Sequence, residues 1–417
     1  ADVIVRSRVE WRRLIEEYWH KRMFLTEHEE YQSVLARLRE ERSRIAPLLP
    51  QVPAALRKAY EQETPPFSII LMNRVEECAP VRMDAPLNLL AARGSVSLTG
   101  CMSAKDTPLE LYDVTSMYDS IILFERANLM PTANVRQMLA EAASHGSIVL
   151  QEMDDHPNVN EAAARDHYFL FRAVSAVQTS TKYLAEYLRE FNPHVYLFEN
   201  QLAELPLARS YDENAPQVTI FFGALNRRAD WEPLMPSINA AIQEHGDRLY
   251  FRVVSDYAFY QQLRTERKSY VGGTQDGSVV APYECYVEEL HSSDIALLPL
   301  NDTEFNRAKS DLKFIEAAGN GAAVLAAPTV YAATVRDGET GLIYHSPKEF
   351  AQKLDLLIRR ADLRRRLAEN AYRYVAEHRL LAGHLDDYIM VYRELFDRRE
   401  ELERERLRRI AKYFPNL

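Results

Sequence analysis

The sequence predicts an α/β protein with two domains, each built on a parallel sheet that carries helices on both faces. The first observation is the length of 417 residues, which exceeds what one compact core usually holds. The second is an alternation of short β-type runs with helical stretches, which begins after "ETPP" (63–66). The third is "QLAELPLARSYDENAPQ" (201–217), where prolines and polar residues interrupt this alternation once.

The N-terminal residues 1–63 predict helices, because apolar side chains recur at helical spacing with charges between them. These side chains are Trp11, Leu14, Ile15, Tyr18 and Trp19. We expect a helical extension that covers apolar surface of its own chain, and a dimer face is the alternative.

The first α/β domain is expected over residues 64–203. Its predicted strands are "FSIILM" (67–72), "SVSLTG" (95–100), "DSIILF" (119–124), "GSIVLQEM" (146–153), "AVSAVQTS" (173–180) and "VYLFEN" (195–200). Strands that alternate with helices in this way form parallel sheets, so a Rossmann-like domain is predicted.

A linker over 204–217 leads to a second Rossmann-like domain over 218–380. Its predicted strands are "VTIFFG" (218–223), "LYFRVVSD" (249–256), "DIALLPL" (294–300), "AAVLAA" (322–327) and "GLIY" (341–344). Ligands of such sheets bind at the carboxyl ends of the strands, so a cleft between the two domains is the expected site. Residues 381–417 are expected to be helices that return to the first domain, with a solvated charged face rather than a calmodulin-like or membrane role.

Composition narrows the class of protein. With 47% apolar and 27% charged residues, the chain is typical of soluble globular proteins. The net charge of −10 and the absence of a basic block disfavour binding to a nucleic-acid polymer. The three cysteines, Cys78, Cys101 and Cys285, are far apart and have no metal-ligand spacing. No apolar run approaches the roughly 20 residues that cross a bilayer, and no signal-peptide pattern is present, so a cytoplasmic location is expected.

The stretch "KSDLKFIEAAGNGAAVLAA" (309–327) predicts a polar stripe on a helix that starts near Ser310. Lys309, Lys313, Glu316 and Asn320 follow one another at steps of four, three and four, which places them on one face. Lysines and free amides at a helix start bind anions, and a carboxylate accepts hydrogen bonds from a vicinal diol. A site for phosphate next to a site for a diol matches the two parts of a nucleotide. The alternative is that the stripe is solvated and that Lys313 and Glu316 pair only incidentally.

A second feature is "IFFGALNRRADWEPL" (220–234), which predicts a strand that ends at Gly223 and a helix capped by Asp230. Glycine allows a ligand to approach the backbone, and paired arginines suit a diphosphate. Asn226, Arg227 and Arg228 in the intervening loop are therefore donor-binding candidates, and surface arginines at a turn are the alternative.

Together with "PYECYVEELHSSDIALLPL" (282–300) and "VRDGETGLIY" (335–344), these motifs resemble the C-terminal nucleotide-sugar domain of GT-B glycosyltransferases of the "group 1" type. In that family a glutamate on this helix binds the ribose, and the matching residue is Glu316. A preceding basic residue serves the phosphates, and Lys313 matches it. The "DGETGLIY" stretch and a strand ending in asparagine, here "VYLFEN", accompany these residues in the family.

The resemblance implies a donor site built mainly on residues 218–345. Its further candidates lie at strand ends, in the "YVGGTQDG" turn (270–277) near the nucleobase, or at helix starts. They are Asp256, Gly273, Thr274, Tyr283, Lys309 and Ser310. The chain departs from the family at Ala308, where many members have a glutamate for the donor sugar, and it lacks a glycine-rich loop after the first strand.

The first domain is expected to hold the acceptor. "ILFERANLMP" (122–131) and "VLQEMDDHPNV" (149–159) place charged residues at the carboxyl ends of strands. Asp154, Asp155 and His156 are the candidates for acceptor binding or proton transfer, and Arg82 and Arg126 are the candidate anion contacts. An N-cap and turn cluster is the alternative for the two aspartates.

The expected function is transfer of a sugar from a nucleoside-diphosphate sugar to a glycan, lipid or protein acceptor. Charge stabilisation of the leaving diphosphate is the expected catalytic effect. No cofactor or metal is expected, because "DD" is not the Asp-x-Asp of the other glycosyltransferase fold. The alternatives are a catalytically silent GT-B scaffold or sugar-nucleotide sensor, and a sugar-nucleotide epimerase. Contact of the terminal helices with a membrane surface or a second copy is left open.

Overall fold

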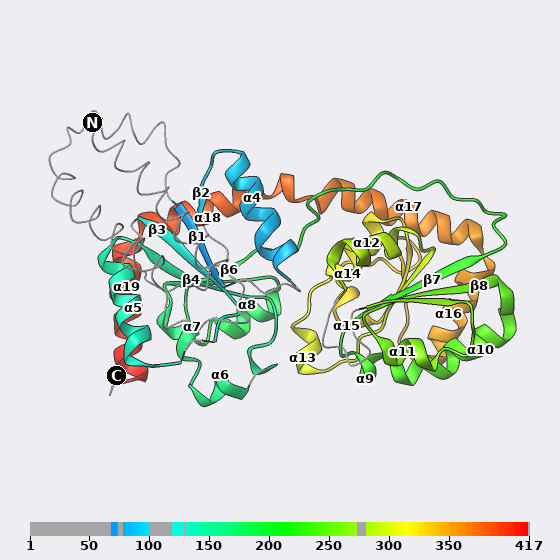
Figure 1. Ribbon diagram of the computed structural model, residues 1–417, viewed down its shortest axis with the longest axis horizontal. Helices are drawn as coiled ribbons and strands as arrows, with labels where there is room; N and C mark the ends of the chain where they lie inside the picture. Colours follow the sequence, from blue (N-terminus) through cyan, green and yellow to red (C-terminus); the bar gives the residue numbers. More distant parts are fainter. Residues whose placement is uncertain are drawn as a thin grey trace, which may run out of the picture. The chain divides into compact units, whose positions relative to one another are not determined.

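The computed structural model of the chain describes residues 68–73, 78–99, 119–128, 130–159, 161–272 and 281–415 (Figure 1). The expected helical extension over 1–63 lies outside these residues, and so do Gly273 and Thr274. The described chain divides into two compact units. One contains the residues up to Phe198 and those from Leu385 onward, and the other is Glu199–His384.

The first unit has a six-stranded sheet in the order β2-β1-β3-β4-β5-β6, and every neighbouring pair is parallel. The strands are β1 (Ser68–Asn73), β2 (Ser97–Thr99), β3 (Ser120–Glu125), β4 (Ile148–Met153), β5 (Ala176–Thr179) and β6 (Val195–Leu197). All residues of β3 and β4 are buried, as expected for parallel strands covered on both faces. The predicted α/β class is confirmed here.

Helices and short helical turns surround this sheet. They are η2 (Pro80–Asp84), α4 (Ala85–Ala92), α5 (Ala133–Ser144), η5 (Pro157–Val159), α6 (Glu161–Arg165), α7 (Phe169–Ala173), α8 (Lys182–Leu188), α18 (Leu385–Asp397) and α19 (Arg399–Tyr413). Thr132 and Thr181 begin α5 and α8, and each side-chain oxygen accepts a hydrogen bond from a backbone amide of the first turn.

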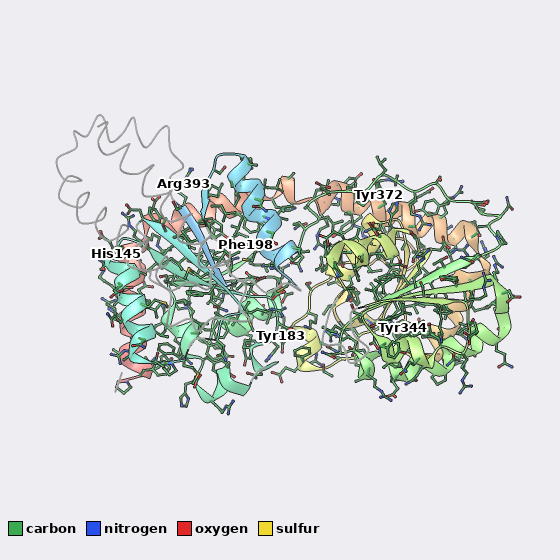
Figure 2. The ribbon with its side chains drawn as sticks, in the orientation of Figure 1. His145, Tyr183, Phe198, Tyr344, Tyr372 and Arg393 are labelled. Atoms are coloured by element: carbon green, nitrogen blue, oxygen red, sulfur yellow. The ribbon has the colours of Figure 1, made fainter. Side chains whose placement is uncertain are left out.

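The helix α18 packs on the first unit through aromatic residues. Phe198, labelled in Figure 2, stacks on Tyr388 with ring centroids 3.9 Å apart. The Tyr392 hydroxyl donates a 2.9 Å hydrogen bond to Gln178 of β5. These contacts fix the C-terminal helices on the unit that begins the chain.

The second unit has a six-stranded parallel sheet in the order β12-β11-β10-β7-β8-β9. The strands are β7 (Val218–Gly223), β8 (Leu249–Val254), β9 (Lys268–Val271), β10 (Ile295–Leu298), β11 (Ala323–Ala326) and β12 (Leu342–Ile343). The strand order reverses between β7 and β10, and the carboxyl ends at such a point form the usual ligand crevice. The edge strand β9 was not predicted, because all four of its residues are only half-buried and give no apolar run.

The helices of the second unit lie on both faces of its sheet, with α12, α14 and α17 on one and α10 and α16 on the other (Figure 1). They are α9 (Arg228–Trp231), η6 (Glu232–Leu234), α10 (Met235–His245), η7 (Gly246–Arg248), α11 (Tyr257–Gln262), α12 (Tyr283–His291), α13 (Glu304–Arg307), α14 (Leu312–Gly319), α15 (Pro328–Tyr331), α16 (Pro347–Arg359), α17 (Ala361–His378) and η8 (Leu381–Gly383). Within the described residues, none of the helices has the length and apolar character that crossing a bilayer requires.

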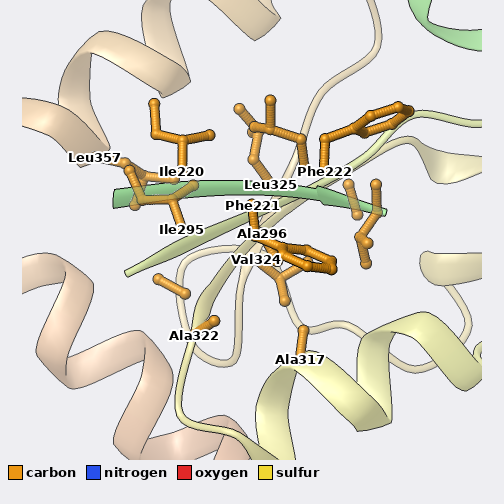
Figure 3. Packing of buried hydrophobic residues seen from close by; sticks show 14 of the residues in the cluster. Ile220, Phe221, Phe222, Ile295, Ala296, Ala317, Ala322, Val324, Leu325 and Leu357 are labelled. Atoms are coloured by element: carbon orange, nitrogen blue, oxygen red, sulfur yellow. The ribbon is translucent and has the colours of Figure 1, made fainter. Parts of the chain in front are cut away.

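The small residues of α14 serve close packing. Ala317 faces the apolar side chains of the sheet (Figure 3), and it is fully buried. A Cβ atom on Gly319 would lie 2.5 Å from a methyl group of Leu202 and 3.8 Å from Val375 of α17. The alanine lets α14 approach the sheet closely, and the glycine lets it approach Leu202.

Candidate functional site

The carboxyl end of β7 is the centre of the candidate site in the second unit. Gly223 ends this strand, and a Cβ atom there would lie 2.6 Å from the rings of both Phe221 and Tyr286. The space that glycine opens is thus taken by two aromatic rings of the protein itself. Its carbonyl oxygen accepts a 2.7 Å hydrogen bond from the Lys313 ammonium.

The face of α14 that meets this strand end presents the predicted pair of charges. Lys313 also lies over the Tyr286 ring, with its nitrogen 5.0 Å from the centroid. Glu316, one turn later, is 3% exposed, and its Oε1 accepts a 2.9 Å hydrogen bond from the Tyr283 hydroxyl. Tyr286 lies close enough to the same carboxylate for the two groups to shift each other's pKa. One ammonium, one carboxylate and two phenols therefore form a single cluster, in which the carboxylate is buried and the other three groups are half-buried.

Burial dominates the protonation of this cluster. It lowers the pKa of the Lys313 ammonium to about 8, and the neighbouring charges of Arg227 and Lys309 lower it while Glu316 raises it. It also raises the pKa of the Glu316 carboxyl, against the opposing effects of Lys313 and the two phenols. A bound anion would shift Lys313 back toward its charged form, so the site is built to respond to negative charge.

The loop after β7 holds Arg227 beside α13. The Arg227 Nη1 donates a 2.6 Å hydrogen bond to Asn306 Oδ1 and lies 3.4 Å from Asp230 Oδ2. Asp230 was predicted to cap the helix, and this is wrong because α9 starts at Arg228 with Arg227 in the cap position. Asp230 instead lies inside the helix, where its Oδ1 accepts hydrogen bonds from the Asn301 amide and from Asn306.

Three other predicted donor residues are placed around this loop. Asn226 has a backbone φ of 54°, a left-handed conformation that asparagine tolerates. The Arg228 side chain is 64% exposed and pairs with Glu232 one turn along its own helix. Lys309 precedes α14 and lies over the Phe305 ring at 4.5 Å, so it is not part of the helical stripe that joins Lys313 and Glu316.

The start of α14 is held by polar contacts. The Ser310 hydroxyl accepts a 2.7 Å hydrogen bond from Asn200, the asparagine that ends "VYLFEN". Asp311, the cap residue, forms a bidentate ion pair with Arg379 at 2.6 and 2.9 Å. Arg379 also donates to the Asn200 carbonyl oxygen at 2.8 Å. Two residues singled out from the sequence, Asn200 and Ser310, thus meet.

Asp256 lies beneath the site, where both of its carboxylate oxygens accept hydrogen bonds from the protein. One accepts from the Phe259 backbone amide at 2.9 Å and the other from the Trp231 indole at 2.8 Å. Ala308, where the family often has a sugar-binding glutamate, is fully buried at the end of α13.

The first unit has its own charged cluster at the carboxyl ends of β3 and β4. Arg126, whose φ is 47°, donates a 2.5 Å hydrogen bond to Asp154 and lies 3.7 Å from Asp155. The Asp155 carboxylate accepts a 3.0 Å hydrogen bond from the His156 amide. The His156 ring is buried and lies 4.7 Å from the ring of Tyr187. The three predicted catalytic residues and Arg126 are therefore neighbours.

Arg82 is almost fully buried in the same unit. Its Nε donates a 2.8 Å hydrogen bond to Glu152, and its Nη1 donates a 2.6 Å bond to the Phe198 carbonyl oxygen. Both partners of this ion pair are at most 2% exposed. Its visible role is to tie η2 to β4 and β6.

Among the described residues, one group could supply three metal ligands, namely Glu244, His245 and Asp355. Arg359 forms ion pairs with both of its carboxylates, and the His245 Nε2 lies 2.8 Å from Asp355. The guanidinium already supplies the positive charge at this place, which is remote from the candidate site.

Comparisons with known proteins show which family model and which solved structures this chain resembles. Residues 240–389 match the family model described as glycosyl transferase-like. No curated protein sequence matches significantly. A solved complex of HepE from Anabaena with UDP-glucose is 12% identical, with a TM-score of 0.52 over 77% of this chain and 97% of that one. A glycosyltransferase from Rickettsia africae ESF-5 is 12% identical, with a TM-score of 0.50 over 79% and 98% of the chains.

TarM from S. aureus is 12% identical with a TM-score of 0.48, and the match covers 68% of this chain but only 56% of TarM. The two parallel-sheet units and the HepE and Rickettsia africae matches define a protein of the GT-B fold. Within it, residues 240–389 match the glycosyl transferase-like family model, and the predicted resemblance to GT-B glycosyltransferases of the group 1 type is confirmed.

Three residues of the site were missed from the sequence. Tyr286 joins Gly223, Lys313 and Glu316, and Asp230 and Asn306 hold Arg227. The spacing of Tyr283 and Tyr286 by three residues on a helix was a usable signal, since it puts both rings on one face. The pairing of Asn306 with Asp230 had no signal, because 76 residues separate them.

Proposed function

We propose that the chain is a glycosyltransferase that moves a sugar from a nucleoside-diphosphate sugar to a glycan, lipid or protein acceptor. The observation that carries the proposal is the pair of the half-buried Lys313 and the buried Glu316 on one face of α14, at the end of β7 where the strand order reverses. A half-buried cation for phosphate beside a buried carboxylate for a diol suits a nucleotide. HepE, which shares the fold, has been solved with UDP-glucose.

In this proposal the second unit stabilises the leaving diphosphate. Lys313 and Arg227 lie near enough to each other to shift the Lys313 pKa, so both charges act at one place. Arg228 joins them only by turning away from Glu232, with which it now pairs. Negative charge grows on the diphosphate as the sugar leaves, and fixed cations lower the barrier because they bind this state more tightly than the donor. Glu316 holds the ribose.

The first unit supplies the acceptor site in this proposal. An inverting transfer needs a base within hydrogen-bond reach of the acceptor hydroxyl, and Asp154, Asp155 and His156 are the candidates. Arg126 pairs with Asp154 and so orients it. No metal is required, because Lys313 and the arginines supply the positive charge; full activity in the presence of EDTA is the expected result.

The test is a thermal-shift screen of the full chain against UDP, GDP, ADP and CDP and their glucose conjugates. A ligand that binds only the folded protein raises the melting temperature, by an amount that grows with its concentration over Kd. We expect a selective shift with one base, and the corresponding labelled donor then serves to detect transfer. No shift with any nucleotide would contradict the proposed function.

A silent sugar-nucleotide-binding scaffold is the second candidate, and the buried Ala308 in place of the family's sugar-binding glutamate favours it. Donor binding without turnover in the presence of broad acceptor mixtures would support it. An epimerase would instead convert the donor without an acceptor, and product analysis of the donor alone separates that case.

A further inference from the structure

The ribose carboxylate of the proposed donor site is already occupied by the protein. Glu316 is 3% exposed, and the Tyr283 hydroxyl donates a 2.9 Å hydrogen bond to its Oε1. A second phenol, Tyr286, lies near the same carboxylate and opposes the rise of its pKa. Burial raises the pKa of Tyr283, so its hydroxyl stays a donor over the whole physiological range. A carboxylate has about four acceptor positions, but so covered a group cannot receive a diol unless a neighbour moves.

The two tyrosines differ in how firmly they are held. The Tyr286 ring lies edge-on to Phe221 with centroids 5.2 Å apart, fills the space above Gly223 and lies under the Lys313 ammonium. Any large movement of Tyr286 would break these contacts together. Tyr283 is the first residue of α12, after an exposed Pro282 in the cap position. The first turn of a helix is its most easily rearranged part, so Tyr283 is the mobile partner.

We propose that the Tyr283 hydroxyl occupies on Glu316 the position that a ribose hydroxyl takes in the complex, and that it withdraws when a nucleotide binds while Tyr286 stays in place. This inference rests on the proposed function. Tyr283 then competes with the ligand within the site. The apparent affinity equals the intrinsic affinity multiplied by the fraction of protein in which Tyr283 has withdrawn, so it is low when that fraction is small. Ligands without a diol gain nothing from its withdrawal.

The test uses the full chain and whichever of UDP, GDP, ADP and CDP binds it most tightly. In Tyr283→Phe the ring stays and the competing bond is gone, so we expect binding that is about tenfold tighter, as for one hydrogen bond to a charged group. In the matched variant Tyr286→Phe we expect binding that is no tighter than that of the wild type, because the hydrogen bond to Glu316 Oε1 comes from Tyr283. The 2′,3′-dideoxy form of the same nucleotide should show no gain with Tyr283→Phe.

Weaker or unchanged binding of the ribonucleotide to Tyr283→Phe would overturn the inference while leaving the donor site intact. A measurement without ligand separates a failure of this inference from a failure of the proposed function. Thermal melting of Tyr283→Phe, Glu316→Gln and the double variant should be non-additive if the two residues bond as described. Non-additive melting without binding of any of the four nucleotides would overturn the proposed function itself.

Discussion

The Lys313 ammonium donates a 2.7 Å hydrogen bond to the carbonyl oxygen of Gly223. This bond joins the first turn of α14 to the last residue of β7, two elements 90 residues apart in the chain. A protonated lysine is thereby held at the strand end where a parallel sheet offers its ligand crevice.

Nucleotide binding should depend on pH through Lys313. Its pKa of about 8 means that the ammonium is charged below that pH and neutral above it. A diphosphate binds the charged form and takes up a proton, so affinity should fall as pH rises through 8, by up to tenfold per unit. Titration calorimetry between pH 7 and 9.5 checks this, since phosphate ionisation near pH 6 is then complete. Lys313→Arg should flatten the profile, and an unchanged slope in that variant would assign the titration to another group.

Gly223→Ala should destabilise the second unit and weaken nucleotide binding. The added methyl group would meet two rings at 2.6 Å, and overpacking of this kind costs about 1–3 kcal/mol. The Gly223 carbonyl oxygen, which accepts the hydrogen bond from Lys313, would move with the end of the strand. Gly383→Ala is the matched control, because a Cβ there meets nothing within 4 Å. Chemical denaturation of the two variants should separate them clearly, and equal midpoints would refute the packing argument.

Arg379→Met should destabilise the second unit by about 3–5 kcal/mol, since it leaves the Asp311 carboxylate unpaired and largely buried. The Asn200 carbonyl oxygen would lose a donor as well. The exposed pair of Arg360 and Asp362 offers a control, and Arg360→Met should leave the denaturation midpoint almost unchanged. A similar effect of both variants would show that the Arg379 contact adds nothing to stability.

The helix α19 should be needed for the stability of the first unit. Arg406 donates to the carbonyl oxygen of residue 173, and Arg409 donates to those of residues 172 and 174 at 3.2 and 2.8 Å. The two guanidinium groups thus satisfy the end of α7. Arg409→Ala should lower the melting temperature of this unit, with a loss of about 1.5–3 kcal/mol for hydrogen bonds to a charged group. The exposed Arg408→Ala should melt as the wild type, and a normal melt of Arg409→Ala would contradict the prediction.

The strands of both sheets could be predicted because parallel strands that are buried on both faces consist of continuous runs of apolar residues. Of the strands in the described residues, all but one coincide with runs such as "SIILFE" and "VTIFFG". The edge strand "KSYV" escaped because polar and charged residues make up half of it. The start of the polar stripe on α14 was also predicted too early in the chain. Lys309 stands at helical spacing, but α14 starts only at Leu312, where Asp311 is pinned by Arg379.

The site was predictable as far as one helix or one loop determines it. Lys313 and Glu316 share a face because both lie on α14, which the spacing gives directly. The partners that set their chemistry come from elsewhere in the chain, with Gly223 at the end of β7 and Tyr286 on α12. Periodicity contains no information on such pairings. The roles of the predicted donor and acceptor residues in binding stay predictions.

The most direct test of the account is calorimetric titration of the wild type, Lys313→Ala and Glu316→Ala with the nucleoside diphosphate selected by the thermal-shift screen. Each substitution removes one charge-assisted contact, so we predict affinities at least about tenfold below the wild type. Melting curves establish that the variants are folded. Wild-type affinity in both folded variants would contradict the claim that α14 forms the nucleotide site.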